Sequence, residues 1–411
     1  MASEMLDLQR IRAEFPALAG DTVFLDNAGG SQVLARVADR VRDYLLHDNV
    51  QLGASYAASQ QAGERVLAAR RAVASRVHAV HDDEIVMGPS TTALIGTLVE
   101  ALRPGLQPGD EVIVTESDHE ANIGAWMQLA QAGVVVRVWR VDVESLNLRL
   151  QDLDLLLGPR TKWVAMTQAS NVLGTVNPVA EVARRAHAVG ARLCVDAVAY
   201  APHRLVDVQA CGADAVVFSF YKVFGPHYAV LWVRRELLLS LPSLNHHFIG
   251  PEVIPYKLQR GNVNYELSWG CAGIVDYLRD VGTSLGATGD DRARMQCAFD
   301  AFARHEDTLA AQLLAWLGSR RGVRIIGLPS VTAGERVPTI SFVVEGRHSE
   351  DIVRRVDAHG IGIRFGDFYA KRLIEALGLQ AQGGVVRVSI AHYNTAGEID
   401  RLLAALDEAL G

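Results

Sequence analysis

The chain is organised around residues 219–227, which read Ser-Phe-Tyr-Lys-Val-Phe-Gly-Pro-His. This stretch follows the apolar run Ala-Val-Val-Phe at 215–218, which predicts a buried strand. Gly225 and Pro226 end the segment, so Lys222 is expected in a tight turn at the end of that strand. The neighbouring aromatic side chains would partly desolvate Lys222. Desolvation favours the neutral amine, which is the form that makes a Schiff base with an aldehyde.

A carboxylate is expected beside this lysine. Asp196 ends another apolar run, Arg-Leu-Cys-Val at 192–195. If both runs are strands of one sheet, Asp196 and Lys222 face the same crevice. Pyridoxal 5'-phosphate (PLP), a ring cofactor with an aldehyde and a basic ring nitrogen, needs such a pair. A solvated turn lysine and a helix-capping aspartate would give the same pattern. The rest of the chain is therefore needed to distinguish a PLP site from these structural roles.

Polar residues follow other apolar runs in the same way. Ser90, His119 and Asn171 each come just after such a run. Ser90, Thr91 and Thr92 begin a helical pattern, where hydroxyls and free N–H groups form an anion site, although capping alone also explains them. Strands alternating with helices predict a mainly parallel sheet covered on both faces, with ligands at the carboxyl ends of its strands.

The composition narrows the class of protein. The chain has 411 residues, of which 49% are hydrophobic and 21% charged, as in soluble globular enzymes. A net charge of −7 without clusters of basic residues disfavours a nucleic-acid partner. The 4 cysteines form no Cys-x-x-Cys pair, so neither a metal site nor a disulfide framework is expected. The acidic N-terminus does not resemble a signal peptide, and no apolar run is long enough to span a membrane. We therefore expect a cytoplasmic protein without a membrane partner.

Several motifs together resemble one family. The chain is similar, from about residue 22 to 408, to the class V aminotransferase group of fold-type I PLP enzymes, and in particular to its cysteine-desulfurase-like branch. The motifs that carry this resemblance are Asp-His-Glu-Ala-Asn at 118–122, Ser-Asn-Val-Leu-Gly-Thr at 170–175, Val-Asp-Ala at 195–197, residues 219–227, Gly-Ile-Arg-Phe-Gly at 362–366, Val-Arg-Val-Ser at 386–389 and Tyr-Asn at 393–394.

The resemblance implies an α/β fold with two domains. A large PLP-binding domain at 48–280 would hold a mainly parallel seven-stranded sheet. A smaller α+β domain would combine residues 1–47 and 290–411. The segment 286–290, which contains two glycines, is the expected hinge.

The resemblance also assigns cofactor-binding roles. Lys222 would form the Schiff base and later move the proton of the substrate α-carbon. Asp196 would pair with the ring nitrogen, His119 would stack on the ring, and Asn171 would hydrogen-bond the ring hydroxyl. The residues expected around the phosphate are Ser90, Thr91, Thr92, Ser219, Tyr221 and, from the neighbouring subunit of a homodimer, Asn262 on the loop 261–264.

Substrate binding is expected on the other side of the site. Arg387 matches the arginine that clamps the substrate carboxylate, a bidentate task suited to a guanidinium. Arg364 matches a second arginine at the mouth of the site. The small-residue segment 23–30 suits a loop beneath a ligand and makes Asn27 a candidate, although a simple turn explains the segment equally.

Two positions depart from the desulfurase pattern. Desulfurases carry a nucleophilic cysteine on the loop after the Arg364 strand, but here Tyr369 stands near that place and no cysteine follows Cys297. The second departure is Ala199, where Gln or His would normally hydrogen-bond the ring hydroxyl. Ala199 would leave extra room for a bulkier substrate.

These departures favour a C–S β-lyase acting on an S-substituted L-cysteine, with release of a thiol. Similar enzymes process cysteine S-conjugates in the biosynthesis of sulfur-containing natural products such as lincosamides. Decarboxylation-dependent oxidative deamination of such a conjugate, and aminotransferase or epimerase chemistry at the α-carbon, remain alternatives. A non-catalytic scaffold is disfavoured because Lys222 and Asp196 are both present. The sequence does not identify the group attached to sulfur.

Overall fold

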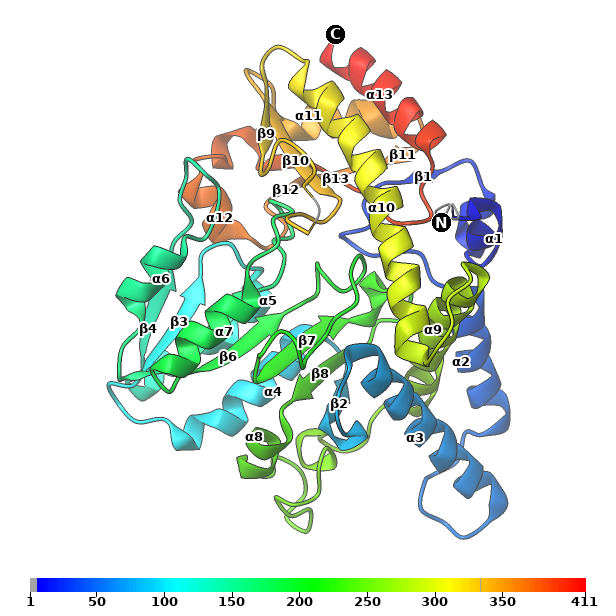
Figure 1. The fold of residues 1–411 in the computed structure, drawn as a ribbon, viewed down its shortest axis with the longest axis vertical. Helices are drawn as coiled ribbons and strands as arrows, with labels where there is room; N and C mark the ends of the chain where they lie inside the picture. Colours follow the sequence, from blue (N-terminus) through cyan, green and yellow to red (C-terminus); the bar gives the residue numbers. More distant parts are fainter. Residues whose placement is uncertain (1–5, 333) are drawn as a thin grey trace.

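A seven-stranded sheet forms the centre of the protein, as the computed structural model of residues 6–332 and 334–411 shows (Figure 1). Its strands are, in spatial order, β2 (Ile85–Gly88), β8 (Ala229–Val233), β7 (Ala215–Ser219), β6 (Arg192–Asp196), β5 (Thr161–Thr167), β3 (Glu111–Thr115) and β4 (Val135–Trp139). The five strands from β7 to β4 are parallel, whereas β8 is antiparallel to both β2 and β7. The mainly parallel seven-stranded sheet predicted from the sequence is therefore confirmed.

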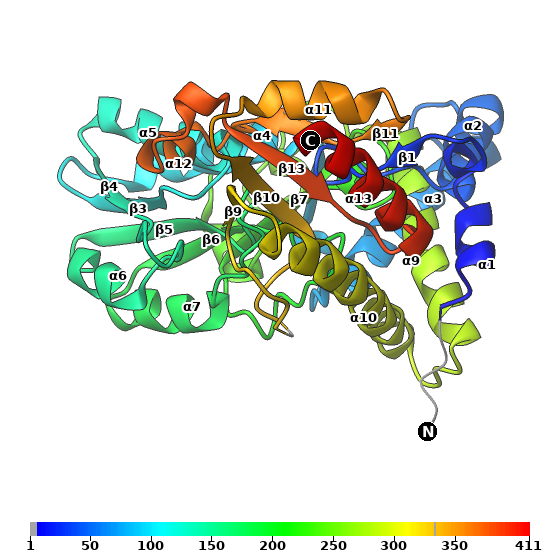
Figure 2. The same ribbon diagram turned by 90° about the horizontal axis from the view of Figure 1, so that it is seen from above.

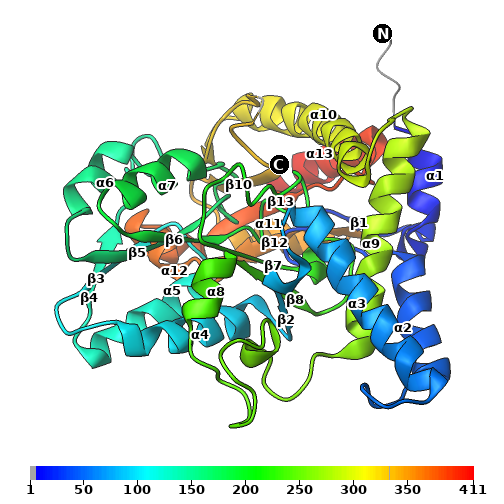
Figure 3. The ribbon, with the colours of Figure 1, turned by 60° about the horizontal axis from the view of Figure 1, so that its bottom comes forward.

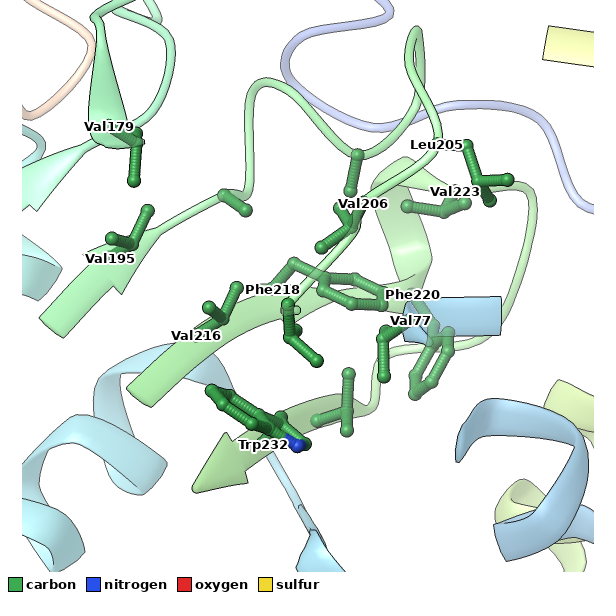
Figure 4. Packing of buried hydrophobic residues seen from close by; sticks show 14 of the residues in the cluster. Val77, Val179, Val195, Leu205, Val206, Val216, Phe218, Phe220, Val223 and Trp232 are labelled. Atoms are coloured by element: carbon green, nitrogen blue, oxygen red, sulfur yellow. The ribbon is translucent and has the colours of Figure 1, made fainter. Parts of the chain in front are cut away.

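Both faces of this sheet are buried, which explains why its strands are apolar without alternation. On β7, Val216 and Phe218 point into one hydrophobic cluster, and Ala215 and Val217 point into a second cluster on the other face. Figure 4 shows the first cluster, which includes Val216 and Trp232, direct partners on the neighbouring strands β7 and β8. Because successive side chains of a strand point to opposite faces, each strand contributes to both clusters.

Helices cover the two faces, as Figure 3 shows from below. One face carries α4 (Thr91–Leu102), α5 (Glu120–Met127) and α8 (Arg235–Ser240), and the other carries α3 (Ala57–Val77), α6 (Leu150–Leu156) and α7 (Val179–Ala188). The helices α2 (Ala35–His47), α9 (Tyr265–Ser284) and α10 (Asp291–Gly318) stand beside the sheet, where α9 packs against α2, α3 and α10. Gly282 of α9 lets α10 approach closely, since a Cβ at this position would lie 1.9 Å from the carbonyl oxygen of Arg294.

A second, antiparallel sheet lies above the carboxyl ends of the central strands (Figures 1 and 2). Its spatial order is β12 (Arg364–Gly366), β13 (Val385–Ser389), β10 (Thr339–Val344) and β9 (Val323–Ile326). A third hydrophobic cluster joins it to α10, α11 (Ser349–Asp357) and α13 (Ala396–Leu410). The smaller α+β unit predicted from the sequence is confirmed, while its boundaries stay a prediction.

The N-terminal part of the chain joins this second unit. β1 (Val23–Phe24) pairs in parallel with β11 (Ile361–Gly362), and the next residues run beside the end of β13 through a bridge between Asp26 and Ser389. The remaining elements are α1 (Leu8–Ala13), α12 (Lys371–Ala376) and the short 3-10 helices η1 (Pro16–Ala19), η2 (Asp82–Glu84), η3 (Arg103–Gly105), η4 (Gln128–Ala132), η5 (Phe220–Lys222), η6 (Tyr256–Leu258) and η7 (Gln380–Gln382). Within residues 6–332 and 334–411, no helix combines the length and apolarity needed to cross a membrane.

Candidate active site

The carboxyl ends of β5, β6 and β7 open into one pocket. Most of the residues predicted to bind a cofactor line it, even though they come from distant parts of the sequence. The lining residues are Ser90, Thr91, Thr92, His119, Ala121, Thr167, Ala169, Asn171, Asp196, Val198, Ala199, Ser219, Tyr221 and Lys222.

Lys222 lies in η5, directly after β7, and is buried. Burial, followed by the positive charge of Arg387, lowers the pKa of its amine from 10.5 to about 8. The N-terminal segment holds this turn in place, since the backbone N–H of Ser31 donates to the carbonyl of Tyr221 at 3.0 Å and its hydroxyl accepts from the N–H of Phe224 at 2.8 Å. Lys222 therefore lies in a tight turn after β7, in surroundings that desolvate its amine.

Asp196 ends β6, which pairs directly with β7. It is 3% exposed, and burial raises the pKa of its carboxyl from 3.8 to about 6. One carboxylate oxygen accepts the backbone N–H of Val198 at 2.8 Å. Asp118 is also buried, and burial, followed by the charge of Asp196, raises the pKa of its carboxyl.

His119 caps α5 and is neutral. Its Nδ1 accepts the backbone N–H of Ala121 at 3.0 Å, which places the ring proton on Nε2. Burial, and then the charges of Lys222 and Arg387, lower the pKa of His119 to about 4. A neutral imidazole with a fixed orientation can lie against the face of an aromatic ring.

Hydroxyl groups gather where α4 begins. Ser90 caps this helix by accepting the N–H of Ala93 at 3.1 Å, and the hydroxyls of Thr91 and Ser219 meet at 2.6 Å. The first turn of a helix leaves N–H groups without helical partners, and these groups attract a phosphate. Tyr221 also lines the pocket. Hydroxyls, a helix N-terminus, a lysine of lowered pKa and a buried aspartate together match the phosphate, aldehyde and ring nitrogen of PLP.

A second cluster of charged residues lies beside the pocket, under the small sheet. Arg387 is 2% exposed. Its Nη2 donates to Oδ1 of Asp26 at 2.8 Å, and its Nη1 donates to the carbonyl oxygen of Asn171 at 3.2 Å. Arg364 approaches the other carboxylate oxygen of Asp26 at 3.7 Å. The aromatic ring of Phe368 covers the guanidinium of Arg387, 3.7 Å from its carbon to the ring centre.

The loop after β12 closes this side of the site. Phe368 and Tyr369 have φ values of 53° and 58°, which is a strained conformation for bulky residues. The side-chain amide of Asn171 donates to the carbonyl of Phe368 at 2.9 Å, and the N–H of Glu120 donates to the carbonyl of Tyr369 at 2.8 Å. The Tyr369 ring lies 5.2 Å from the ring of His119. Tyr369 therefore stands at the mouth of the pocket.

Three predicted residues have surroundings that the sequence did not indicate. Asn27 is buried, with its amide nitrogen donating to the carbonyls of Phe24 and Ser389 and its oxygen accepting from the Tyr393 hydroxyl, so its side chain supports the fold. Asn262 lines a separate open pocket. Ala199 borders the site as predicted but also packs against Ala169 and Val337.

Among the residues around the site that sequence reasoning missed are Thr167, Asp26 and Phe368. Thr167 ends β5 and could have been found by the rule that identified Asn171 and Asp196. Asp26 and Phe368 gave no such signal, because only the pairing of distant strands brings them to Arg387.

This fold and this pocket define a PLP-dependent enzyme of fold type I. The comparison with known proteins agrees: residues 23–402 match the family model for aminotransferase class-V, and the chain belongs to this family. Members of the family, including its cysteine desulfurases, are PLP-dependent enzymes, so PLP is the cofactor.

The chain is similar to aminotransferase-like and cysteine desulfurase-like proteins of this family. The chain is 40% identical to the aminotransferase-like protein FGM3 of Gibberella zeae, with 100% of both chains covered. It is 32% identical to the cysteine desulfurase-like protein ustD of Aspergillus flavus, over 98% of this chain and 91% of that one. Among solved structures, the cysteine desulfurase CsdA of Escherichia coli is similar with a TM-score of 0.85 and 29% identity, covering 99% of both chains.

Proposed function

We propose that this protein is a C–S lyase that cleaves an S-substituted L-cysteine by β-elimination. The observation that supports this is a pocket with a base but no thiol. Lys222 borders the pocket with a lowered pKa, whereas Cys194 and Cys271 are buried elsewhere and Cys211 and Cys297 lie outside its lining. The desulfurase reaction needs a protein thiolate to attack the substrate sulfur, while β-elimination does not.

PLP, when bound, supplies an aldehyde for the substrate amine and a ring that accepts electrons from the α-carbon. Asp196 would hold a proton at the ring nitrogen, because a buried carboxylate is stabilised by a positive partner. Lys222 would take the proton from the substrate α-carbon, which an amine with a pKa of about 8 can do near neutral pH. Arg387 would bind the α-carboxylate.

The bond changes balance with water as the only other reactant. The bond between the β-carbon and sulfur breaks, and its electron pair leaves with the sulfur, which becomes a thiol on protonation. Water then converts the three-carbon remainder into pyruvate and ammonia. The substituent on sulfur would face the mouth of the site, where Tyr369 is 70% exposed and leaves room for groups of different size.

One relative supports a role in natural-product biosynthesis. The chain is 35% identical to part of the nonribosomal peptide synthetase-like enzyme fsqF of Aspergillus fumigatus, covering 97% of this chain and 26% of that one. We propose that the thiol is released during the assembly of a sulfur-containing secondary metabolite.

We also propose a homodimer. Asn262 borders a wide, open pocket together with His227 and Arg260. The ring of His227 stacks on that of Tyr221, which lines the Lys222 pocket, so the two pockets adjoin. In a dimer, the loop at 261–264 would reach the phosphate site of the other subunit. Size-exclusion chromatography with light scattering should give twice the mass of the chain, and a monomer with full PLP affinity would contradict this arrangement.

The reaction is tested by comparing S-ethyl-L-cysteine with free L-cysteine. The enzyme should convert S-ethyl-L-cysteine into ethanethiol, pyruvate and ammonia in equal amounts, and free cysteine should be a poor substrate that leaves no persulfide on the protein. Sulfide release from free cysteine at the faster rate would refute the proposal. Carbon dioxide with an aldehyde would indicate the decarboxylating route, and a keto acid that retains its sulfur would indicate an aminotransferase.

Substitutions at Ala199 test what determines the choice between β-elimination and decarboxylation. Ala199→Gln and Ala199→His would restore a hydrogen bond near the ring hydroxyl. Both variants should shift the ratio of pyruvate to carbon dioxide. An unchanged ratio in both would remove Ala199 from the argument.

A further inference from the structure

Two arginines face each other at the mouth of the site. Arg364 and Arg387 are direct partners in the antiparallel pairing of β12 with β13. Like charges opposite each other on neighbouring strands are destabilising. Asp26 lies between them, 2.8 Å from Nη2 of Arg387 and 3.7 Å from Nη1 of Arg364. One carboxylate therefore serves two guanidinium groups.

The Nε–Nη2 edge of the Arg387 guanidinium can bind a carboxylate. Its Nη1 is bonded to the carbonyl oxygen of Asn171, and its face is covered by Phe368. On the remaining edge, Nη2 binds Asp26, while Nε is buried and has no hydrogen-bond partner. A buried donor without a partner is costly, and the Nε–Nη2 edge has the geometry that binds a carboxylate through two hydrogen bonds.

We infer that Asp26 is an internal substitute for the substrate carboxylate, which must displace it from Arg387. This inference rests on the proposed role of Arg387. A carboxylate across Nε and Nη2 satisfies the free donor, and Asp26 then stays with Arg364. A ligand without a carboxylate does not displace Asp26 from Arg387, so its affinity does not depend on Asp26. Asp26 thus keeps Arg387 neutralised between turnovers and lowers the affinity of every carboxylate ligand by competing with it.

The surroundings of Asp26 fit this role. It is neither deeply buried nor fully exposed, and its backbone is fixed by the bridge to Ser389. Gly29 makes room for the carboxylate, since a Cβ at Gly29 would lie 2.6 Å from Oδ2 of Asp26. Asp367, the other carboxylate of this region, is exposed and accepts the N–H of Tyr369 at 2.9 Å. Asp367 is therefore a matched control for the loss of one negative charge.

The test measures binding of propionate and its uncharged analogue propionamide to the PLP-loaded enzyme by calorimetry. Neither probe has a basic amine, so neither reacts with the cofactor. Asp26→Asn should bind propionate about tenfold more tightly than the native enzyme, the factor expected when one competing charge-assisted hydrogen bond is removed. Propionamide binding should not change, and Asp367→Asn should alter propionate binding by less than about twofold.

Unchanged or weaker propionate binding by Asp26→Asn would overturn the inference, and so would an equal gain in Asp367→Asn. If Asp26→Asn does not fold, Gly29→Ala provides a second variant, because the added methyl group pushes the Asp26 carboxylate away without changing its charge. It should also tighten propionate binding, and no gain would count against the inference. Arg387→Ala should abolish propionate binding; if it does not, the assumed role of Arg387 is wrong. Failure of the lyase proposal would appear only in the product assay.

Discussion

The pKa of Lys222 can be tested through the rate at which the cofactor-free enzyme captures PLP. Only the neutral amine attacks the aldehyde. At pH 7.5 an amine with a pKa of 8 is about 24% neutral, whereas one with the ordinary pKa of 10.5 is about 0.1% neutral, a difference of about 240-fold in rate. The neutral fraction rises with pH, so the capture rate should rise through about pH 8 and then level off.

The substitution Arg387→Met tests what lowers the pKa of Lys222. After burial, the charge of Arg387 is the largest contribution that lowers the pKa of Lys222. Asp26, which acts in the opposite direction, would keep Arg364 as its remaining partner. The midpoint should therefore move upward but stay below 10.5, because burial remains. Arg364→Met, which removes the smallest of these contributions, should move it less.

The assay is stopped-flow absorbance of the bound cofactor between pH 6 and 11. A native midpoint near 10.5 would refute the desolvation argument, and a native midpoint that Arg387→Met leaves unchanged would refute the electrostatic part. The same pKa shift affects stability. Between about pH 8 and 10.5 the unfolded lysine binds more protons than the folded one, so the cofactor-free protein should become more stable as the pH rises through this window.

Three further predictions concern single residues. Lys222→Ala should leave no PLP fixed to the protein after borohydride reduction, and a cofactor that is still fixed would assign the link to another lysine. Asp196→Asn should lower kcat by about a hundredfold or more in steady-state assays while PLP stays bound, and a normal rate would contradict its role at the ring nitrogen. Gly174→Ala should lower the free energy of unfolding in urea by about 3 kcal/mol, because φ is +71° and the new Cβ would lie 2.3 Å from the carbonyl oxygen of Thr339. Gly190→Ala, with φ +79° and open space, should cost only about 1 kcal/mol, and equal losses would refute the steric argument.

The pocket could largely be predicted because its residues follow a repeated local rule. In a parallel sheet, all strands end at the same edge, so polar residues that come directly after apolar runs lie together. Asn171, Asp196 and Lys222 obeyed this rule, and the structure brings them into one pocket. The order of the strands and the antiparallel direction of β8 were beyond such reasoning, since they depend on pairing between distant segments.

The mouth of the site was harder to predict for the same reason. Asn27 was chosen over its neighbour, although adjacent residues of an extended segment point in opposite directions. Which of the two faces Arg387 depends on the pairing of this segment with the end of β13, and the structure selects Asp26. The loop at 366–370 carries no periodicity, so the position of Phe368 over a buried guanidinium could not be inferred from the chain alone.

The backbone of that loop is held without help from the Tyr369 side chain. Its N–H is bonded to Asp367 and its carbonyl to Glu120, so the position of the Cα is set by neighbours. A different side chain could be exchanged at this position while the loop kept its shape. The chemical group offered at the mouth of the site could therefore change by one codon, without any rebuilding of the scaffold.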